Sequence, residues 1–484
     1  MYLGIDFGTS FSQISTIHHG QPILLLNPGE YGIPSAFYYD KENDILVGQE
    51  ALDAGQGSSA KNLVLDVKMK LINQNTYVLD GRTFTSEEII TEILKYLIRK
   101  ATLNAKKHFI DSKIDGYVIS IPAKFGIQER TVIKNAVVKA VGSQVEVKYI
   151  IKEPVSAAIS YFKDTLADNQ NVLVFDLGGG TCDVALVRSE SKATGYFTVI
   201  DSDMVRLGGR NWDEELVKYI IQIIENKSSV IIRGNVGFEE KIRRTAISVK
   251  HDLSEKERSI ARVELNGIIY TTPISRNVFD EITSHLLRET FSCLQDVYDR
   301  NISSCKIDDI ICVGGSSNML QIQEAISRQF SSCRVHLYRP EHAVVNGAAS
   351  FATCGMINDQ SCFSYGIDTY YDYDNDPNKI VVLNILKRGS HLPTSDTQYF
   401  RPYANNLSKM VLSIYESEFE NEYYDFSEKE KRFVGKLIIN FPPNVTSDLS
   451  VECTVTLNIN GLLEVRAKDS LGQQMKAVFQ LENL

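Results

Sequence analysis

Two short segments of the chain place an aspartate at the end of an apolar run and follow it with glycine and hydroxyl residues. The first, Tyr2–Ile17, reads YLGIDFGTSFSQISTI, and the second, Val172–Val187, reads VLVFDLGGGTCDVALV. Both read as a strand, a turn and a second strand, with Asp6 and Asp176 at the ends of the first strands. The turn residues are Gly8, Thr9 and Ser10 in the first segment and Gly178, Gly179, Gly180 and Thr181 in the second.

These turns have the composition of phosphate-binding loops. Glycine lets the backbone approach a ligand closely, and successive backbone N–H groups form a concave site for phosphate oxygens. Asp6 and Asp176 can hold Mg²⁺ mainly through its water shell, as this ion prefers. One such turn is typical of a plain hairpin. Two copies and a later Gly-Gly turn in Ile310–Ser317 (IICVGGSS) predict a clamp around a nucleoside triphosphate, although no Walker loop is present.

The elements that would position these turns alternate between strand and helix up to about residue 355. Gly116–Pro122 and Asn171–Asp176 have strand patterns, and Ser86–Ala105 has apolar residues at helical spacing. This alternation predicts an α/β fold, and the repeated hairpin predicts two similar lobes. Beyond it, Val451–Ile459 and Leu462–Ala467 flank an Asn-Gly pair, as in a β-hairpin. We therefore expect an α/β domain over 1–355, a linker over 356–366 and an all-β domain over 367–484.

Composition restricts the class of protein. The 484 residues include 51 Lys and Arg against 61 Asp and Glu, a net charge of −10, which argues against general nucleic-acid binding. No apolar run approaches the roughly 18 residues of a membrane span, and the N-terminus has no secretory pattern. The eight cysteines are scattered without metal-ligand spacing, so structural zinc is not expected. The composition favours a soluble, cytoplasmic protein.

A series of motifs then resembles one family. In order along the chain they are GIDFGTS (Gly4–Ser10), DVKMKL (Asp66–Leu71), ISIPAKF (Ile119–Phe125), IIKEPVSAAISY (Ile150–Tyr161), DLGGGTCDV (Asp176–Val184), LGGRNWDEEL (Leu207–Leu216), VGGSSNM (Val313–Met319) and PEHAVVNGAA (Pro340–Ala349). The set is similar to the superfamily of actins, sugar kinases and seventy-kilodalton heat-shock chaperones, and most similar to the chaperones. FSYGIDT (Phe363–Thr369) and LNINGLLEVRAKD (Leu457–Asp469) resemble the chaperones' substrate-binding β-sandwich, which actins and sugar kinases lack.

The resemblance implies a two-lobed actin-like ATPase fold, followed by a β-sandwich, and a set of site residues. Lys68 would lie near the γ-phosphate and the attacking water, with Glu153 and Asp176 orienting that water and Asp6 and Asp176 supporting Mg²⁺. Thr181 and Thr9 would hydrogen-bond phosphate oxygens. Taken singly, Lys68 is typical of a solvated lysine and Glu153 of a helix start. The other residues expected around the nucleotide are Gly8, Ser10, Gly178, Gly179, Gly180, Gly208, Gly209, Lys250, Ser254, Gly314, Gly315 and Ser316.

Several positions depart from the family pattern. Ile247 replaces an acidic residue and Asn318 an arginine that stacks on adenine, so we expect weaker or less adenine-selective binding than in typical members. Tyr149 and Lys152 replace residues linked to J-domain docking, and the linker segment Asn358–Cys362 (NDQSC) is not rich in Leu and Val. J-domain stimulation and coupling between the domains are therefore in doubt. Pro122 and Arg130 match the family's hinge proline and signalling arginine.

The sequence thus predicts an ATP-dependent, chaperone-like protein that binds ATP or ADP with Mg²⁺, hydrolyses ATP slowly and binds peptide or protein clients through a β-domain without a helical lid. A nucleotide-exchange factor is a possible partner. One alternative is a nucleotide-regulated scaffold that recognises one dedicated partner with negligible turnover. A sugar or metabolite kinase is a third interpretation, which the β-domain disfavours.

Overall fold

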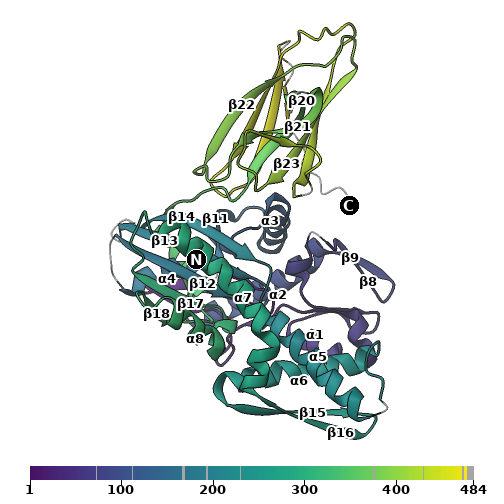
Figure 1. The fold of residues 1–484 in the computed structure, drawn as a ribbon, viewed down its shortest axis with the longest axis vertical. Coiled ribbons are helices and arrows are strands. Elements are labelled where there is room, and N and C mark those ends of the chain that lie inside the picture. Colours follow the sequence, from purple (N-terminus) through teal and green to yellow (C-terminus); the bar gives the residue numbers. More distant parts are fainter. Residues whose placement is uncertain are drawn as a thin grey trace. The chain divides into compact units, whose positions relative to one another are not determined.

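The computed structural model describes residues 1–71, 73–111, 113–165, 169–191, 195–228, 230–373, 376–428, 430–470, 472 and 474–476 (Figure 1). The chain forms two compact units. The first comprises Met1–Ala123 and Ile133–Ile357, and the second comprises Lys124–Val132 and Asn358–Leu484. Each unit has its own sheets and its own hydrophobic core.

The N-terminal part of the first unit is built on a six-stranded sheet of order β11-β10-β1-β2-β3, with β4 paired to β2. Strands β11, β10 and β1 run parallel to one another. Strand β2 is antiparallel to both of its neighbours, β1 and β3. The strands are β1 (Tyr2–Phe7), β2 (Phe11–His18), β3 (Gln21–Leu24), β4 (Ile33–Pro34), β10 (Gly116–Ile121) and β11 (Glu146–Lys152). The first glycine-rich turn therefore lies between β1 and β2.

A second six-stranded sheet of the first unit repeats this topology in the order β18-β17-β12-β13-β14-β19. Its parallel part is β18, β17 and β12, and β12, β13 and β14 follow as an antiparallel meander. The strands are β12 (Gln170–Leu177), β13 (Cys182–Ser191), β14 (Tyr196–Val205), β17 (Asp309–Val313), β18 (Arg334–Leu337) and β19 (Met356–Asn358). The hairpin repeat seen in the sequence is thus a repeat of structure, with the second glycine-rich turn between β12 and β13.

Helices pack on both sheets of the first unit (Figure 1). They are α1 (Gln49–Ala54), α2 (Ser86–Lys107), α4 (Glu153–Thr165), α5 (Gly209–Lys227), α6 (Val236–Glu255), α7 (Arg276–Asn301), α8 (Leu320–Gln329) and α9 (Ala343–Cys354). Short elements complete the unit: β5 (Phe37–Asp40), β6 (Asp44–Val47), β7 (Leu63–Val64), β8 (Thr76–Leu79), β9 (Arg82–Thr85), β15 (Arg258–Leu265), β16 (Ile268–Ser275), and the 3-10 helices η1 (Gly57–Asn62), η2 (Val67–Lys70) and η3 (Gly315–Asn318).

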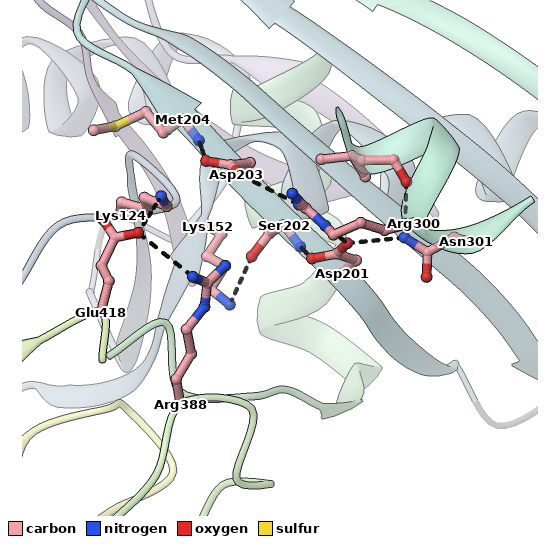
Figure 2. Close-up of polar contacts among 11 residues, drawn as sticks. Lys124, Lys152, Asp201, Ser202, Asp203, Met204, Arg300, Asn301, Arg388 and Glu418 are labelled. Atoms are coloured by element: carbon pink, nitrogen blue, oxygen red, sulfur yellow. Dashed lines mark hydrogen bonds and ion pairs between the residues drawn. The ribbon is translucent and has the colours of Figure 1, made fainter. Parts of the chain in front are cut away.

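Side-chain contacts fix one end of α2 and one end of α7 in this unit. Helix α2 begins with a capping box, in which the Thr85 hydroxyl accepts the Glu88 N–H and the Glu88 carboxylate accepts the Thr85 N–H. At the end of α7, Arg300 donates to Asp201 at 2.8 Å and to Asp203 at 3.2 Å, both on β14 (Figure 2). These contacts hold α7 against the sheet.

Helices α4 and α9 pack so closely that Gly347 cannot carry a side chain. A Cβ atom at Gly347 would lie 1.7 Å from the carbonyl oxygen of Ser156 on α4. We expect Gly347→Ala to lower the free energy of unfolding by about 3 kcal/mol, because the helices must move apart. Denaturant unfolding would measure the loss, with Gly315→Ala as control, since a Cβ there meets nothing within 4 Å. Equal stability of the two variants would contradict this packing argument.

The second unit contains a five-stranded sheet of order β24-β21-β20-β23-β25 and a four-stranded sheet of order β22-β26-β27-β28. Their buried side chains, such as Ile367 and Val455, belong to one hydrophobic core. The strands are β20 (Ser364–Tyr373), β21 (Asp376–Leu386), β22 (Thr394–Phe400), β23 (Lys409–Ser417), β24 (Tyr423–Asp425), β25 (Arg432–Asn440), β26 (Val451–Leu457), β27 (Leu463–Asp469) and β28 (Gln474–Lys476). The predicted Asn-Gly hairpin is confirmed as β26 and β27. The chain is therefore a mixed α/β protein whose C-terminal part is made of β-sheets.

Residues 124–132, which include the start of α3 (Ile127–Val141), belong to the second unit. Ile127 lies in its core, and the Ile127 N–H donates to Glu416 at 3.0 Å. Arg130, the predicted signalling arginine, donates to the Asn460 carbonyl at 3.3 Å. Lys124 pairs with Glu418 at 2.9 Å, and Arg388 donates to the same carboxylate (Figure 2).

The predicted linker is hydrogen-bonded in both of its halves. Met356 and Ile357 form part of β19, which pairs with β14. The Leu392 N–H then donates to the Asp359 carbonyl at 2.8 Å, and Ser361 exchanges backbone hydrogen bonds with Gly389 and Ser390. This part of the chain therefore has a defined backbone conformation.

Burial of Glu416 is expected to make the stability of the second unit depend on pH. Burial, with Glu129 nearby, raises the pKa of Glu416 from 4.5 to about 7, despite Arg432 and the hydrogen bond from Tyr365. Between these values the folded state holds a proton that the unfolded state has lost, so the free energy of unfolding falls as pH rises, by about 3 kcal/mol in all. Amide hydrogen exchange of β20, β23 and β25 between pH 4.5 and 8 would measure this decline.

The matched variants are Glu416→Gln and Glu418→Gln. The first removes the buried titrating group, so the decline should largely disappear. The second removes a carboxylate whose side chain is 47% exposed, so the decline should persist. Exchange that is independent of pH in the unchanged protein, after correction for the intrinsic chemical rate, would refute this assignment.

Candidate functional site

A cavity of about 1440 Å³ lies in the first unit, where both glycine-rich turns open onto it. The sequence-predicted residues that line it are Asp6, Gly8, Thr9, Ser10, Lys68, Glu153, Asp176, Gly178, Gly179, Thr181, Gly209, Lys250, Ser254, Gly314, Gly315 and Ser316. Gly180 and Gly208 do not line the cavity. They pack against each other, since a Cβ at Gly208 would lie 2.4 Å from the Gly180 nitrogen.

The second glycine-rich turn is held by two neighbouring elements. The Gly209 N–H at the start of α5 donates to the Gly178 carbonyl at 2.9 Å, and the Ser316 hydroxyl in η3 donates to the same oxygen at 2.9 Å. Gly314 precedes η3 with φ of +79°, and a Cβ there would lie 2.5 Å from an Asp176 carboxylate oxygen. The glycines at these positions thus let three backbone segments converge on one point.

The first glycine-rich turn is fixed by β-sheet neighbours. The Ser35 hydroxyl donates to the Gly8 carbonyl at 2.7 Å, and the Ser35 N–H donates to the Ser10 carbonyl at 2.9 Å. Thr9 is buried in this turn. Both turns are therefore rigidly supported from behind while their other side faces the cavity.

Lys68 and Glu153 form a buried ion pair at the cavity wall. Lys68 lies in η2 and Glu153 is the first residue of α4, directly after β11. The Lys68 ammonium donates to Glu153 at 2.5 Å and to the Phe7 carbonyl at 2.5 Å. The Lys68 side chain is only 3% exposed, which excludes the interpretation of a solvated lysine.

Four buried carboxylates surround this lysine. Burial raises the pKa of Glu153 to about 8 and that of Asp183 to about 6, and it raises the pKa values of Asp6 and Asp176 as well. Mutual repulsion adds to the effect at Glu153 and Asp176. Asp6 accepts a hydrogen bond from Ser120 at 2.9 Å, and Asp183 accepts one from the Ala123 N–H at 2.6 Å. Negative charge is therefore disfavoured at these carboxyls, and a cation would favour their ionised forms.

No group of three His, Cys, Asp or Glu side chains in the described ranges is arranged to ligate a metal directly. Asp6 and Asp176 could hold Mg²⁺ through its water shell, because this ion keeps several of its waters when bound to proteins.

Helix α6 contributes Lys250 and Ser254 to the cavity wall. Lys250 pairs with Asp213 at 2.8 Å and donates to the Gly209 carbonyl at 2.9 Å, and Ser254 donates to the Lys250 carbonyl at 3.2 Å. Ile247 and Asn318 also line the cavity, and the Asn318 amide donates to the Gly315 carbonyl at 3.0 Å. Lys250 thus anchors the start of α5, beside the second turn.

Sequence reasoning missed several charged residues of the cavity, among them Arg210 and Asp66. They come from α5 and from the residue before η2, and their side chains form an ion pair. The signal available in the sequence was the arginine directly after Gly208-Gly209, but nothing in the sequence pairs it with Asp66.

None of the helices in the described part of the chain combines the length and the hydropathy needed to span a membrane.

The fold and the cavity define an α/β protein with two topologically equivalent sheets, each of which presents a glycine-rich turn to one shared site. The family model described as Hsp70 protein matches residues 69–483. The chain is also 29% identical over 492 residues to the Chaperone protein DnaK of Mycoplasma mycoides subsp. mycoides SC, covering 98% of this chain and 79% of that protein. The chain therefore belongs to the Hsp70 family, which confirms the resemblance inferred from the motifs.

Membership supports a chaperone function and ATP binding, since Hsp70 proteins are chaperones that bind ATP and ADP. The family match begins at residue 69, so Lys68 and the first glycine-rich turn lie outside it.

Proposed function

We propose that the chain is an ATP-dependent chaperone whose first unit binds and hydrolyses ATP and whose second unit binds extended peptide segments. The observation that carries the proposal is the buried Lys68–Glu153 pair, which lies in the same cavity as the two glycine-rich turns. In this proposal the first unit is an actin-like ATPase domain and the second is a β-sandwich.

The phosphates would be bound by backbone N–H groups of the turns at Gly8–Ser10 and Gly178–Thr181, with the Thr9 and Thr181 hydroxyls as further donors. Lys68 would stabilise negative charge on the transferred phosphoryl group. Glu153 and Asp176, which line the cavity, would orient the attacking water or take its proton. Bound Mg²⁺ would supply further charge neutralisation, and Asp6 and Asp176 would hold it through its water ligands.

At the nucleoside end, Lys250, Ser254, Gly314, Gly315 and Ser316 would surround the ribose and base. Ile247 and Asn318 offer the base neither a carboxylate nor a planar cation, so discrimination between purines should be weak. We expect the dissociation constants of ATP and GTP, measured by calorimetry, to differ by less than about tenfold. Tight binding of ATP alone would contradict this expectation.

For peptide binding, the second unit offers exposed apolar side chains on adjacent strands. Val411 on β23 pairs in register with Ile438 on β25, and they are 41% and 43% exposed. Tyr370 and Tyr403, also exposed, have ring centroids 6.1 Å apart. An extended apolar segment could bind this unit through side-chain pockets and backbone hydrogen bonds.

The burial of Tyr149 and Lys152 supports the expectation that a J-domain protein docks poorly on this chain. Tyr149 is buried and its ring packs edge-on against Phe351, with centroids 5.1 Å apart. Lys152 is 2% exposed. Side chains so placed do not provide a docking surface, so we expect little stimulation of ATP hydrolysis by a standard J-domain protein.

The second candidate is a nucleotide-regulated scaffold with negligible turnover. Single-turnover ATP hydrolysis separates the two, because a chaperone ATPase converts bound ATP and a scaffold does not. Retention of intact ATP over hours, with normal ATP binding, would overturn the enzymatic proposal in favour of the scaffold.

A further inference from the structure

Arg210 is a further cation of the nucleotide cavity, besides Lys68 and Lys250. It is the second residue of α5, and its side chain crosses to the first glycine-rich turn. Its Nε donates to the Ser10 hydroxyl at 3.2 Å and one Nη donates to the Thr9 carbonyl at 3.1 Å, while the other Nη pairs with Asp66. Its backbone N–H donates to the Gly179 carbonyl at 2.9 Å, so this one residue contacts both turns.

The surroundings keep this guanidinium charged and accessible from the cavity. Burial lowers the pKa of Arg210 to about 10, partly offset by Asp213, so the side chain remains cationic at neutral pH. Its side chain is 22% exposed and lines the cavity. The N-terminus of α5, a helix of 19 residues, adds positive potential at the same point.

We propose that Arg210 is a phosphate-binding residue. When a nucleotide binds, its guanidinium would release Asp66 and contact the terminal phosphates. This inference rests on the proposed function, because it assumes that the two turns bind phosphate. A phosphate held by both turns lies beside the guanidinium, which already contacts each turn. The planar fork of arginine suits two oxygens of one phosphate.

The competing explanation is that Arg210 only ties the two sides of the cavity together through Asp66. The two roles differ in how binding depends on the number of phosphates. Loss of a residue that binds the terminal phosphates weakens the binding of ATP most and of AMP least. Loss of a residue that only links the two sides of the cavity weakens the binding of all three nucleotides alike.

The test measures the affinities of AMP, ADP and ATP with Mg²⁺ by calorimetry for the full chain and for Arg210→Gln, Arg210→Lys, Asp66→Asn and Arg243→Gln. We expect Arg210→Gln to weaken ATP binding by about tenfold to hundredfold and AMP binding by less than about threefold. Arg210→Lys should recover part of the loss. Asp66→Asn should leave ATP binding equal or tighter, because it removes the carboxylate that competes for Arg210.

Arg243→Gln is the matched control, because Arg243 lines the same cavity and lies near enough to influence the pKa of Arg210. It should weaken ATP binding by less than about threefold. The inference is overturned if Arg210→Gln weakens the binding of AMP and ATP equally, or weakens neither. It is also overturned if Arg243→Gln or Asp66→Asn weakens ATP binding as much as Arg210→Gln does. If Arg210→Gln does not fold, the Arg210→Lys and Asp66→Asn results decide. Failure of the unchanged protein to bind ATP would refute the proposed function instead.

Discussion

Replacement of Lys68 with alanine is expected to lower the rate of single-turnover ATP hydrolysis by about a thousandfold. The ammonium is fixed by Glu153 and the Phe7 carbonyl, so it is preorganised for charge that develops on the phosphoryl group, and one such donor contributes two to three powers of ten in rate. ATP binding should weaken by less than about tenfold, because the backbone N–H groups of the two turns remain. Rapid mixing with a radiolabelled nucleotide would measure the rate, and calorimetry the affinity.

The control for this prediction is Lys61→Ala. Lys61 lines the same cavity but lies in η1, whereas Lys68 and Glu153 lie in η2 and α4. Its removal should change the rate by less than about twofold. If Lys68→Ala hydrolyses bound ATP at a rate close to that of the unchanged protein, Lys68 is a structural partner of Glu153 and the catalytic assignment fails.

Much of the fold could be predicted because its signals are local. The helix predicted over Ser86–Ala105 forms α2, whose capping box is visible in the sequence as Thr85 followed by Glu88. The hairpin repeat was recognisable because glycine and aspartate recur at the same distance from an apolar strand. By contrast, the placement of residues 124–132 in the second unit depends on tertiary contacts of Ile127 and Glu416 that no periodicity records.

The candidate site, like the fold, could be predicted from the sequence only in part. Glycines at the turns were predictable from backbone requirements, and the structure brings these turns together in one cavity. The ion pair of Arg210 with Asp66 was not predictable, because it joins segments that are distant in sequence. The raised pKa values of Glu153 and Asp183 are equally invisible in sequence, since burial causes most of each increase.

Removal of Mg²⁺ is the second change with a large expected effect. Asp6, Glu153 and Asp176 line the cavity that the phosphates would enter, and burial has raised their pKa values, so further negative charge is disfavoured there. ATP without a cation would add repulsion, so chelation with EDTA should weaken ATP binding by at least about a hundredfold, or roughly 3 kcal/mol. The stabilisation of the protein by ATP against thermal unfolding should then largely vanish, which can be measured without any turnover.

The carboxylate variants assign that effect to particular residues. Asp176→Asn should raise the Mg²⁺ concentration needed for half-maximal thermal stabilisation by ATP by about tenfold or more, because Asp176 would hold the hydrated ion. Asp183→Asn is the matched control, since Asp183 is equally buried but accepts the Ala123 N–H at 2.6 Å. Its midpoint should move by less than about threefold. Equal shifts in the two variants would mean that Mg²⁺ responds only to the total charge of the cavity, whereas a shift confined to Asp176→Asn locates the ion beside the second glycine-rich turn.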